Sequence, residues 1–423
     1  MLPQAPAARK GAVTFIFITV AIDMIALGII APVLPKLIAN FLGGNLSSAA
    51  EITGLFTTVW AVMQFLCSPL LGMLSDRVGR RPVILISCGA TAIDFAIMAM
   101  APNLWWLFAG RVLSGMTTAN ITAAYAYIAD VTTPERRAAS YGLLSSAFGL
   151  GFVIGPAIGG LAGNVDPRLP FWIAAALSVA NTLYGVFVLP ESLPKEHRTA
   201  KLEWRRANPL GSLRLLGRHR ELYGLSAVTF IALVAHEALP NLWVLYLIAQ
   251  FAWDERAIGL SLALVGVCSS ITAAFLVGPA VARFGERRTL MFGLFTFMLA
   301  NVLFAVPNGY VIVLGIIVIS LSIYNSPVQS LMSKRVERTE QGELQGAMGA
   351  LRGISMLIGP GIFTLTFAEF AGPWRGLELL GAPFLLAAAM LALALILAWR
   401  VTSRADDVAL PLPEAVPAFV VDG

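Results

Sequence analysis

Long apolar segments separated by short polar stretches follow one another along almost the whole chain. About 20 apolar residues in an α-helix, rising 1.5 Å per residue, cross the ~30 Å hydrocarbon core of a bilayer. Twelve such segments can be marked off, at 12–34, 54–74, 83–101, 104–128, 139–161, 171–189, 222–247, 258–280, 289–306, 310–332, 346–368 and 377–399. The pattern predicts an all-α integral membrane protein with twelve transmembrane helices.

The last six segments repeat features of the first six. The stretch from Gly72 to Arg81 returns 206 residues later, Pro102-Asn103 returns after 205 residues, and Gly155-Pro156 returns after 204. We therefore predict two pseudo-symmetric six-helix bundles, 12–189 and 222–399, joined by a basic linker at 190–221. Residues 1–11 are the predicted N-terminal segment before the first bundle, and residues 400–423 are the predicted C-terminal tail after the second. Paired halves of this kind are typical of transporters whose substrate path lies between them.

Composition and charge agree with a membrane protein and set its orientation. The chain is 58% hydrophobic and 13% charged, with a mean hydropathy of +0.79, which excludes an ordinary soluble globule. A cytoplasmic N-terminus places 23 of the 29 Lys and Arg residues in the cytoplasm, because four lie outside and two lie within segments. Lys and Arg accumulate on the cytoplasmic side of membrane proteins. We therefore expect both termini in the cytoplasm, a location in the inner membrane, and no nucleic-acid partner.

The linker and the tail have simpler predicted roles. The linker is expected to orient the protein and to contact anionic lipid rather than to dock another protein, with a short surface helix near 202–216. The tail from Ala405 is rich in Pro and Ala and is expected to be disordered.

No enzymatic or metal-binding constellation is evident in the sequence. The three cysteines lie in apolar segments, the chain has three scattered histidines, and no Gly-x-x-x-x-Gly-Lys-Ser/Thr phosphate loop is present. We expect a monomeric secondary transporter, not an enzyme, with no cofactor and no metal. Its partners are then a small-molecule substrate, protons and lipid, and the proton gradient drives it.

Five charged residues interrupt the apolar segments: Asp23, Asp94, Arg111, Glu237 and Arg352. Each costs about 3 kcal/mol on insertion scales, so such residues usually face a bundle interior or a wet cavity. Both aspartates lie about 16 Å from the predicted cytoplasmic ends of their helices, near the midplane. Arg111 has the reach to pair with either of them, whereas Glu237 and Arg352 lie at different depths and are not expected to pair directly.

A carboxylate near the midplane suits proton coupling, because burial and a neighbouring Arg act on its proton in opposite directions. The predicted proton-coupling residues are Asp23, Asp94, Arg111 and Glu237. The candidate substrate-binding residues are Gln64, Asp94, Asn120, Glu237, Trp243, Asn325, Gln329 and Arg352. For the uncharged ones, the alternative is hydrogen bonding between helices.

Three motifs carry a family resemblance from about Thr14 to Trp399. Gly72-x-Leu-Ser-Asp76-Arg77-x-Gly79-Arg80-Arg81 resembles the loop between helices two and three of the major facilitator superfamily. Arg111-x-x-x-Gly115 resembles its helix-four proton-coupling motif. Gly155-Pro156-Ala-Ile-Gly159-Gly160, with Gly151 before it, resembles the helix-five motif of its antiporters. The resemblance implies a twelve-helix drug:proton antiporter.

These motifs have physical roles. Gly79 permits a tight turn, and Asp76 is expected to meet Arg77 or Arg80 and the N-terminal end of a helix in the other half. By analogy, Asp130 completes this cytoplasmic latch. The helix-five glycines are expected to pack closely against the other half, and the sequence does not separate packing from sealing against protons.

Further residues resemble the tetracycline efflux proteins: Asp23 to Pro35, Met63-Gln64, Asp94 and Ser146 to Gly151. The resemblance implies proton-coupled export of a small amphipathic drug or metabolite. The alternatives are a proton-coupled importer or facilitator and a sensor that does not transport. The tetracycline exporters have an acidic residue in helix nine and a histidine in helix eight. This chain has no acidic residue in segment 289–306 and no histidine in segment 258–280. It has Glu237 and Arg352 in addition. A substrate other than tetracycline is therefore compatible with the chain.

Overall fold

The computed structural model describes residues 6–117, 120–199, 211, 213–337 and 340–403, and all regular elements in that part of the chain are helices. The first half comprises α1 (Pro6–Ile30), α2 (Leu34–Phe41), α3 (Leu46–Val78), α4 (Arg80–Met100), α5 (Leu104–Thr117), α6 (Asn120–Val131), α7 (Pro134–Val165) and α8 (Leu169–Val188). A short turn, η1 (Lys195–His197), precedes the second half. This half comprises α9 (Leu213–Arg218), α10 (Arg220–His236), α11 (Ala238–Phe251), α12 (Glu255–Ile271), η3 (Thr272–Leu276), α13 (Val277–Ala305), α14 (Gly309–Ser320), α15 (Asn325–Ser333), α16 (Gln341–Ala371), η5 (Arg375–Leu377) and α17 (Ala382–Ser403).

Ten stretches of the described residues are helical, apolar and long enough to cross a membrane. One of them, Glu255–Ala305, has 51 residues, and the non-helical backbone of Gly285 divides it into two crossings. The predicted segment 104–128 is not among the ten because α5 and α6 flank residues 118–119, which lie outside the described part. The division of Glu255–Ala305 adds one crossing, and the segment that contains α5 and α6 adds another. The twelve-helix membrane fold is therefore confirmed.

Several helices differ from the predicted segments. The helix α3 runs from Leu46 to Val78, well beyond the predicted 54–74. Of the predicted surface helix near 202–216, the structure describes only α9, which begins at Leu213. The predicted disordered tail lies outside the described residues. Hydropathy marks the part of a helix that lies in lipid, so it does not mark where the helix itself ends.

Three of the predicted crossings are each divided into two helices by a short turn or loop. The first divides into α1 and α2, the seventh into α10 and α11 at Glu237, and the tenth into α14 and α15. Pro32, Pro240 and Pro327 lie at or just after these breaks. Proline has no backbone N–H and removes a helical hydrogen bond. Broken helices often mark the binding sites of transporters, and here one break places an acidic residue at a helix junction.

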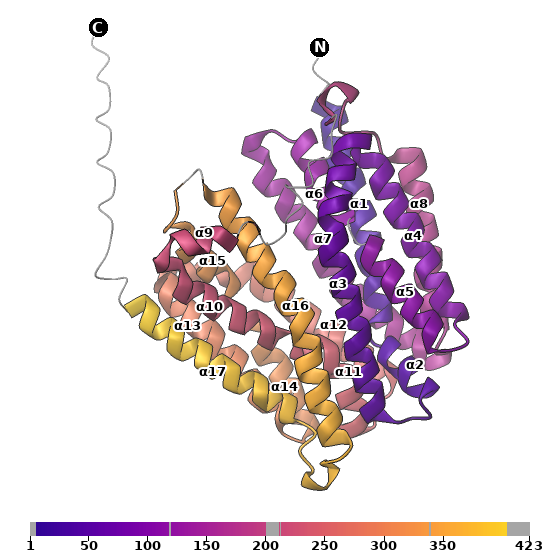
Figure 1. Cartoon of the computed structure of the whole chain (residues 1–423), viewed down its shortest axis with the longest axis vertical. Helices are drawn as coiled ribbons and strands as arrows, with labels where there is room; N and C mark the ends of the chain where they lie inside the picture. Colours follow the sequence, from indigo (N-terminus) through magenta and orange to yellow (C-terminus); the bar gives the residue numbers. More distant parts are fainter. Residues whose placement is uncertain (1–5, 118–119, 200–210, 212, 338–339, 404–423) are drawn as a thin grey trace.

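The two halves meet at the predicted outer end and diverge toward the predicted cytoplasmic end. In Figure 1, α3 and α16 lie side by side in the lower part of the view and separate toward the top. A continuous buried core joins the second half to the outer end of the first, through residues such as Ile38, Phe56 and Phe171. A separate core, which includes Ile16, Ile84 and Tyr127, fills the cytoplasmic end of the first half. The structure is therefore closed at its outer end.

Candidate functional site

Asp94 and Arg111 form an ion pair within the first half. Asp94 of α4 is fully buried, and Arg111 of α5 donates from Nη2 to its Oδ2 at 3.5 Å. The same nitrogen lies 3.6 Å from the sulfur of Met98. Gly110 brings the two helices together, because a Cβ at this position would fall 2.6 Å from Asp94 Oδ1. Of the two pairings that the sequence left open for Arg111, the structure shows the one with Asp94.

Asp23 has different partners. It is buried in α1, where it accepts a hydrogen bond from Asn181 Nδ2 at 2.8 Å and lies 3.6 Å from the thiol of Cys88. Asn181 also donates to the carbonyl of Thr19 at 2.9 Å. Sequence reasoning did not find Asn181, although an amide inside the apolar segment 171–189 was a usable signal. Asp23 thus joins α1, α4 and α8, and its proton-coupling role stays a prediction.

Glu237 lies at the junction of α10 and α11 and is half-buried. Asn241 donates to its backbone carbonyl at 2.8 Å and to its Oε2 at 3.3 Å. Its Cβ and Cγ pack against Gly359 of α16. Arg352 of α16 interacts with Glu237 electrostatically, but no salt bridge joins them among the described residues.

An aromatic group lies beside these charges. The rings of Phe297 and Tyr324 stack at 5.5 Å, and His236 meets Phe297 edge-on at 6.1 Å. Sequence reasoning missed Phe297 and Tyr324 because a single aromatic residue in an apolar helix carries no distinguishing signal. His236, Glu237, Phe297, Tyr324 and Arg352 are called the second-half cluster below.

The remaining substrate-binding candidates divide into three groups. Asn325 and Gln329 are exposed on α15, where Gln329 Nε2 donates to Gln345 at 2.8 Å, and Gln64 is half-buried on α3. Trp243 is 1% exposed and donates from its indole nitrogen to Ser261 at 2.8 Å. Its placement inside the second half favours a packing role over contact with substrate. The side chain of Asn120 lies outside the described residues.

The predicted latch centres on Arg80, at the start of α4. Its guanidinium contacts Asp76 at 2.5 Å, Asp130 at 3.1 Å and the hydroxyl of Ser75 at 2.9 Å. Gly79 has φ 113°, a value that residues with a Cβ rarely adopt, which agrees with the predicted tight turn. Arg77 is exposed, and Gly72 has open space around it. The expected contact with a helix of the other half is absent from these bonds, because Asp76, Arg80 and Asp130 all belong to the first half.

Glu191, from the linker, completes this charge network and was not predicted. Its Oε1 accepts from the backbone N–H of Arg80 at 2.9 Å, and its Oε2 lies 3.6 Å from Arg198. A carboxylate at the first N–H groups of a helix is stabilised by the helix dipole. Arg81, also at the start of α4, donates to the carbonyl of Val186. The linker is thereby fixed to the loop between α3 and α4.

The second half contains the same arrangement with the charges reversed. Glu286 takes the place of Arg80, 206 residues on, and Lys334 takes the place of Asp130, 204 residues on. Lys334 Nζ lies 2.7 Å from Glu286 Oε1, and Ser330 donates to the same oxygen. Gly285, like Gly79, has a positive φ, of 76°. The second copy therefore lacks the motif's Asp76 but keeps an ion pair at the same place.

The helix-five motif packs on both sides. Gly151, Gly155 and Gly159 of α7 contact α1 of their own half, where Gly155 meets Gly28 backbone to backbone. Gly160 and Pro156 contact Gly259 of α12, in the other half. The prediction that the whole face packs against the other half was wrong, because the glycines repeat on two faces of α7. Gly115, in the helix-four motif, brings α5 against Trp60 and Met63 of α3.

An ion pair that was not predicted joins the halves at the outer end. Lys36 of α2 contacts Glu255, the first residue of α12, and the Glu255 side chain is only 7% exposed. Nearby, Ser47 of α3 donates to the carbonyl of Ala368 of α16 at 2.8 Å. These are contacts between different halves, so they hold the outer end closed.

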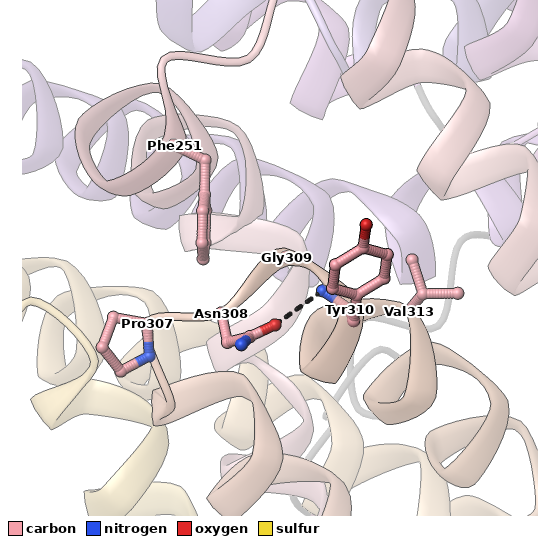
Figure 2. A pocket seen from close by; sticks show the side chains of 6 residues that line it. All are labelled: Phe251, Pro307, Asn308, Gly309, Tyr310 and Val313. Carbon is pink, nitrogen blue, oxygen red and sulfur yellow. Dashed lines mark hydrogen bonds between the residues drawn. The ribbon is translucent and has the colours of Figure 1, made fainter.

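A shallow depression of about 520 Å³ lies at the outer end of the second half, between Phe251 and the loop that leads into α14. Figure 2 shows Asn308 in this loop, with its side-chain oxygen accepting from the backbone N–H of Tyr310 at 2.9 Å. This bond caps α14. The depression contains none of the candidate residues.

The comparisons with known proteins agree with this geometry. Two tetracycline resistance proteins are similar to the chain: class C of Escherichia coli, 40% identical over 85% of this chain and 90% of that protein, and class G of Vibrio anguillarum, 36% identical over 87% and 93%. The human organic anion transporter MFSD10 has a similar structure, with a TM-score of 0.67 and 23% identity over 93% of this chain and all of that one. The sequence profile of the Major Facilitator Superfamily matches residues 16–239 and 225–421. The chain belongs to the Major Facilitator Superfamily and is therefore a multi-pass membrane transporter of small molecules.

Proposed function

We propose that this protein exports a small amphipathic drug or metabolite across the cytoplasmic membrane in exchange for protons. The observation that carries the proposal is the Asp94–Arg111 ion pair, buried inside the membrane-spanning part of a chain that resembles tetracycline resistance proteins over most of its length. We further propose that both termini lie in the cytoplasm and that a single chain is the transporting unit. Tetracycline is one candidate substrate among several, because this chain lacks the helix-eight histidine and the helix-nine acid.

The ion pair gives a physical basis for the coupling. A proton that reaches Asp94 removes its negative charge and with it most of its attraction for Arg111. The guanidinium is then no longer held at Asp94. Protonation therefore shifts the equilibrium between different packing arrangements of α4 and α5. A pH gradient supplies about 1.4 kcal/mol per proton for each pH unit.

Alternating access provides the route. The structure has its outer end closed by Lys36–Glu255 and by the packing of α7 on α12. Export requires a second state in which these contacts open while the cytoplasmic ends close. The Arg80 network is proposed to take part in that closure, through Asp76, whose side chain is 44% exposed.

The test measures drug accumulation in a pump-deficient bacterium that expresses this chain. The panel contains tetracyclines, amphenicols and lipophilic cations, each with and without a protonophore. Lower accumulation of one class, reversed by the protonophore, would support export. The Asp94→Asn variant is the matched control, because it keeps the shape of the side chain and cannot titrate. Uptake that increases with expression would instead indicate an importer.

A further inference from the structure

Asp23 lies where three helices of the first half meet. Its Oδ1 accepts a hydrogen bond from Nδ2 of Asn181 on α8 at 2.8 Å, and its Oδ2 lies 3.6 Å from the thiol of Cys88 on α4. All three side chains are at most 1% exposed. In Figure 1, α8 lies beside both α1 and α4. A carboxylate buried this deeply depends on the hydrogen-bond donors that are fixed around it.

The amide of Asn181 is satisfied at its nitrogen but not at its oxygen. Nδ2 donates to Asp23 and to the backbone carbonyl of Thr19 on α1, the latter at 2.9 Å. Oδ1 is buried and has no hydrogen-bond partner in the described part of the chain. Buried polar atoms without a partner are rare and costly in native interiors, so this oxygen requires an explanation.

The unpartnered oxygen is the group that a protonated Asp23 needs. An ionised carboxylate only accepts hydrogen bonds, and the amide nitrogen suits it, whereas a carboxylic acid has a hydroxyl that must donate. A turn of the amide by about 180° exchanges its nitrogen and oxygen, which differ little in size. The same side chain therefore contains a matching partner for each protonation state of Asp23.

We propose that Asn181 is a positioning residue for proton exchange, whose amide turns from donor to acceptor when Asp23 takes up a proton. The inference rests on the proposed proton-coupled export and extends it to a residue outside the Asp94–Arg111 pair. Because Asn181 is fully buried, it acts through Asp23 and not by contact with a substrate.

The turn also changes what joins α1 to α8. It takes Nδ2 away from the carbonyl of Thr19, so one of the two Asn181 bonds between these helices is lost. Ser178 precedes Asn181 by three residues on the same face of α8, and its buried hydroxyl has no partner among the residues that the structure describes. This hydroxyl offers an acceptor to the displaced nitrogen. Protonation thereby moves a hydrogen bond from the α1–α8 interface into α8 itself.

The charged groups around Asp23 leave the proton to this cluster. Cys88 is the titratable side chain within hydrogen-bonding distance of Asp23, and Asp94, also on α4, is paired with Arg111. The helices packed on α1 are α6, α7 and α8. As described, α8 contains no acidic or basic residue, and those of α6 and α7 lie at their cytoplasmic ends: Asp130, Glu135, Arg136 and Arg137.

Infrared difference spectroscopy of the purified full chain in lipid nanodiscs tests the inference without a substrate. A protonated carboxyl group has its own carbonyl-stretch band, and the part of this band that disappears in Asp23→Asn belongs to Asp23. The bands of Asp94 and of Glu237 in the second-half cluster remain in that variant. A side-chain amide band that changes with the same midpoint as Asp23, and is missing from Asn181→Leu, is the expected sign of the turn.

Two variants of Asn181 measure its effect on the proton. Asn181→Leu nearly keeps the shape of the side chain and removes the donor to the ionised carboxylate. The Asp23 midpoint should therefore move to higher pH by about one unit, a ten-fold change in proton affinity. Asn181→Ala, which only shortens the side chain, should shift it the same way and replaces the leucine variant if that one does not fold.

A control and an exchange separate this role from packing. Asn301 of α13 is also 1% exposed and donates to a helix carbonyl, that of Phe297, at 2.9 Å, so Asn301→Leu should leave the Asp23 midpoint unchanged. Asp23→Asn combined with Asn181→Asp restores a carboxylate beside an amide and should restore a titrating band. An Asp23 midpoint that neither Asn181 variant changes, or an amide band that does not follow Asp23, would overturn the inference.

Flux in proteoliposomes separates this inference from the proposed function. The pH dependence of proton-driven flux in Asn181→Leu should shift together with the Asp23 midpoint. Proton-driven export without an Asn181-dependent titration of Asp23 would leave the exporter standing and remove the role of Asn181. Such a titration in a chain that no proton gradient drives would leave the hydrogen-bond exchange standing and remove the antiport.

Discussion

Removal of the Lys36–Glu255 ion pair should shift the protein toward its outward-open state. The pair joins α2 of one half to α12 of the other, so it exists only while the outer end is closed. Two unit charges at about 4 Å attract by roughly 4 kcal/mol at an effective dielectric constant of 20 and by about 1 kcal/mol in water. Glu255 is 7% and Lys36 32% exposed, so the environment lies between these limits. Ordering the lysine chain offsets part of the attraction, because its rotamer entropy is worth up to about 2 kcal/mol.

We therefore expect Lys36→Met to cost the closed state about 1–2 kcal/mol, which changes the ratio of the two states by roughly 5- to 30-fold. Met keeps an unbranched chain only one atom shorter than that of Lys and removes its charge. Glu255→Gln should have a similar effect, although it also removes a carboxylate from the N-terminus of α12, worth a further ~0.3–1 kcal/mol. The exchanged pair, Lys36→Glu with Glu255→Lys, should restore part of the closed population.

The assay measures the distance between spin labels at Asn40→Cys and Tyr310→Cys, two exposed positions at the outer ends of different halves. Cys67 and Cys268 are replaced by serine, and Cys88 stays because it is 1% exposed. Arg168→Gln is the matched control: it removes an outer cation that bonds Ala101 of its own half at 2.9 Å. A Lys36→Met distance distribution identical to that of the unmutated chain would refute the reasoning.

Three further predictions concern the interior and the loops. Asp94→Asn should abolish proton-driven flux in proteoliposomes while substrate exchange without a gradient persists; normal flux driven by a pH gradient would remove Asp94 from the coupling. Gly155→Val should destabilise the fold by more than 2 kcal/mol, because its Cβ would meet the backbone of Gly28 at 2.5 Å, whereas Gly72→Ala, with open space around it, should leave the melting temperature unchanged. Glu286→Lys should lower the melting temperature by placing two like charges together, and adding Lys334→Glu should restore it; equal stability of both variants would show that the pair contributes nothing.

The sequence predicted the features that depend only on position along the chain. Hydropathy located the twelve crossings, and the 204- to 206-residue offsets located the two halves, because burial in lipid repeats along the chain whatever the helices pack against. Depth along a helix is also one-dimensional, so Asp23 and Asp94 were both placed near the midplane. Depth says nothing of the direction in which a side chain points, and for that reason the partner of Arg111 stayed open until the structure showed Asp94.

Contacts between distant segments were beyond this reasoning. Lys36 lies in a largely apolar stretch and Glu255 in a short polar one, 219 residues apart, and nothing in either stretch marks the other as its partner. Trp243 was predicted to bind substrate, with hydrogen bonding between helices as the alternative, and its position along the chain could not show that its indole nitrogen donates to Ser261 in the same half. Pro240 follows the break at Glu237 and predicts a local distortion of the helix. It does not predict that the acidic residue lies at the junction of the two helices.

The reversed charges of Arg80–Asp130 and Glu286–Lys334 restrict how parts of this protein can be exchanged. In the first half the loop supplies the cation of this ion pair and the helix supplies the anion, and in the second half the loop supplies the anion and the helix the cation, so loop and helix form a matched set within their own half. Grafting the first loop alone into the second half would set an arginine against Lys334, and the reciprocal graft would set a glutamate against Asp130. A functional hybrid made from these duplicated halves must therefore move the loop together with its partner helix, α6 or α15. The two halves share the same arrangement of loop and helix, but the charges of the ion pair that joins them are exchanged.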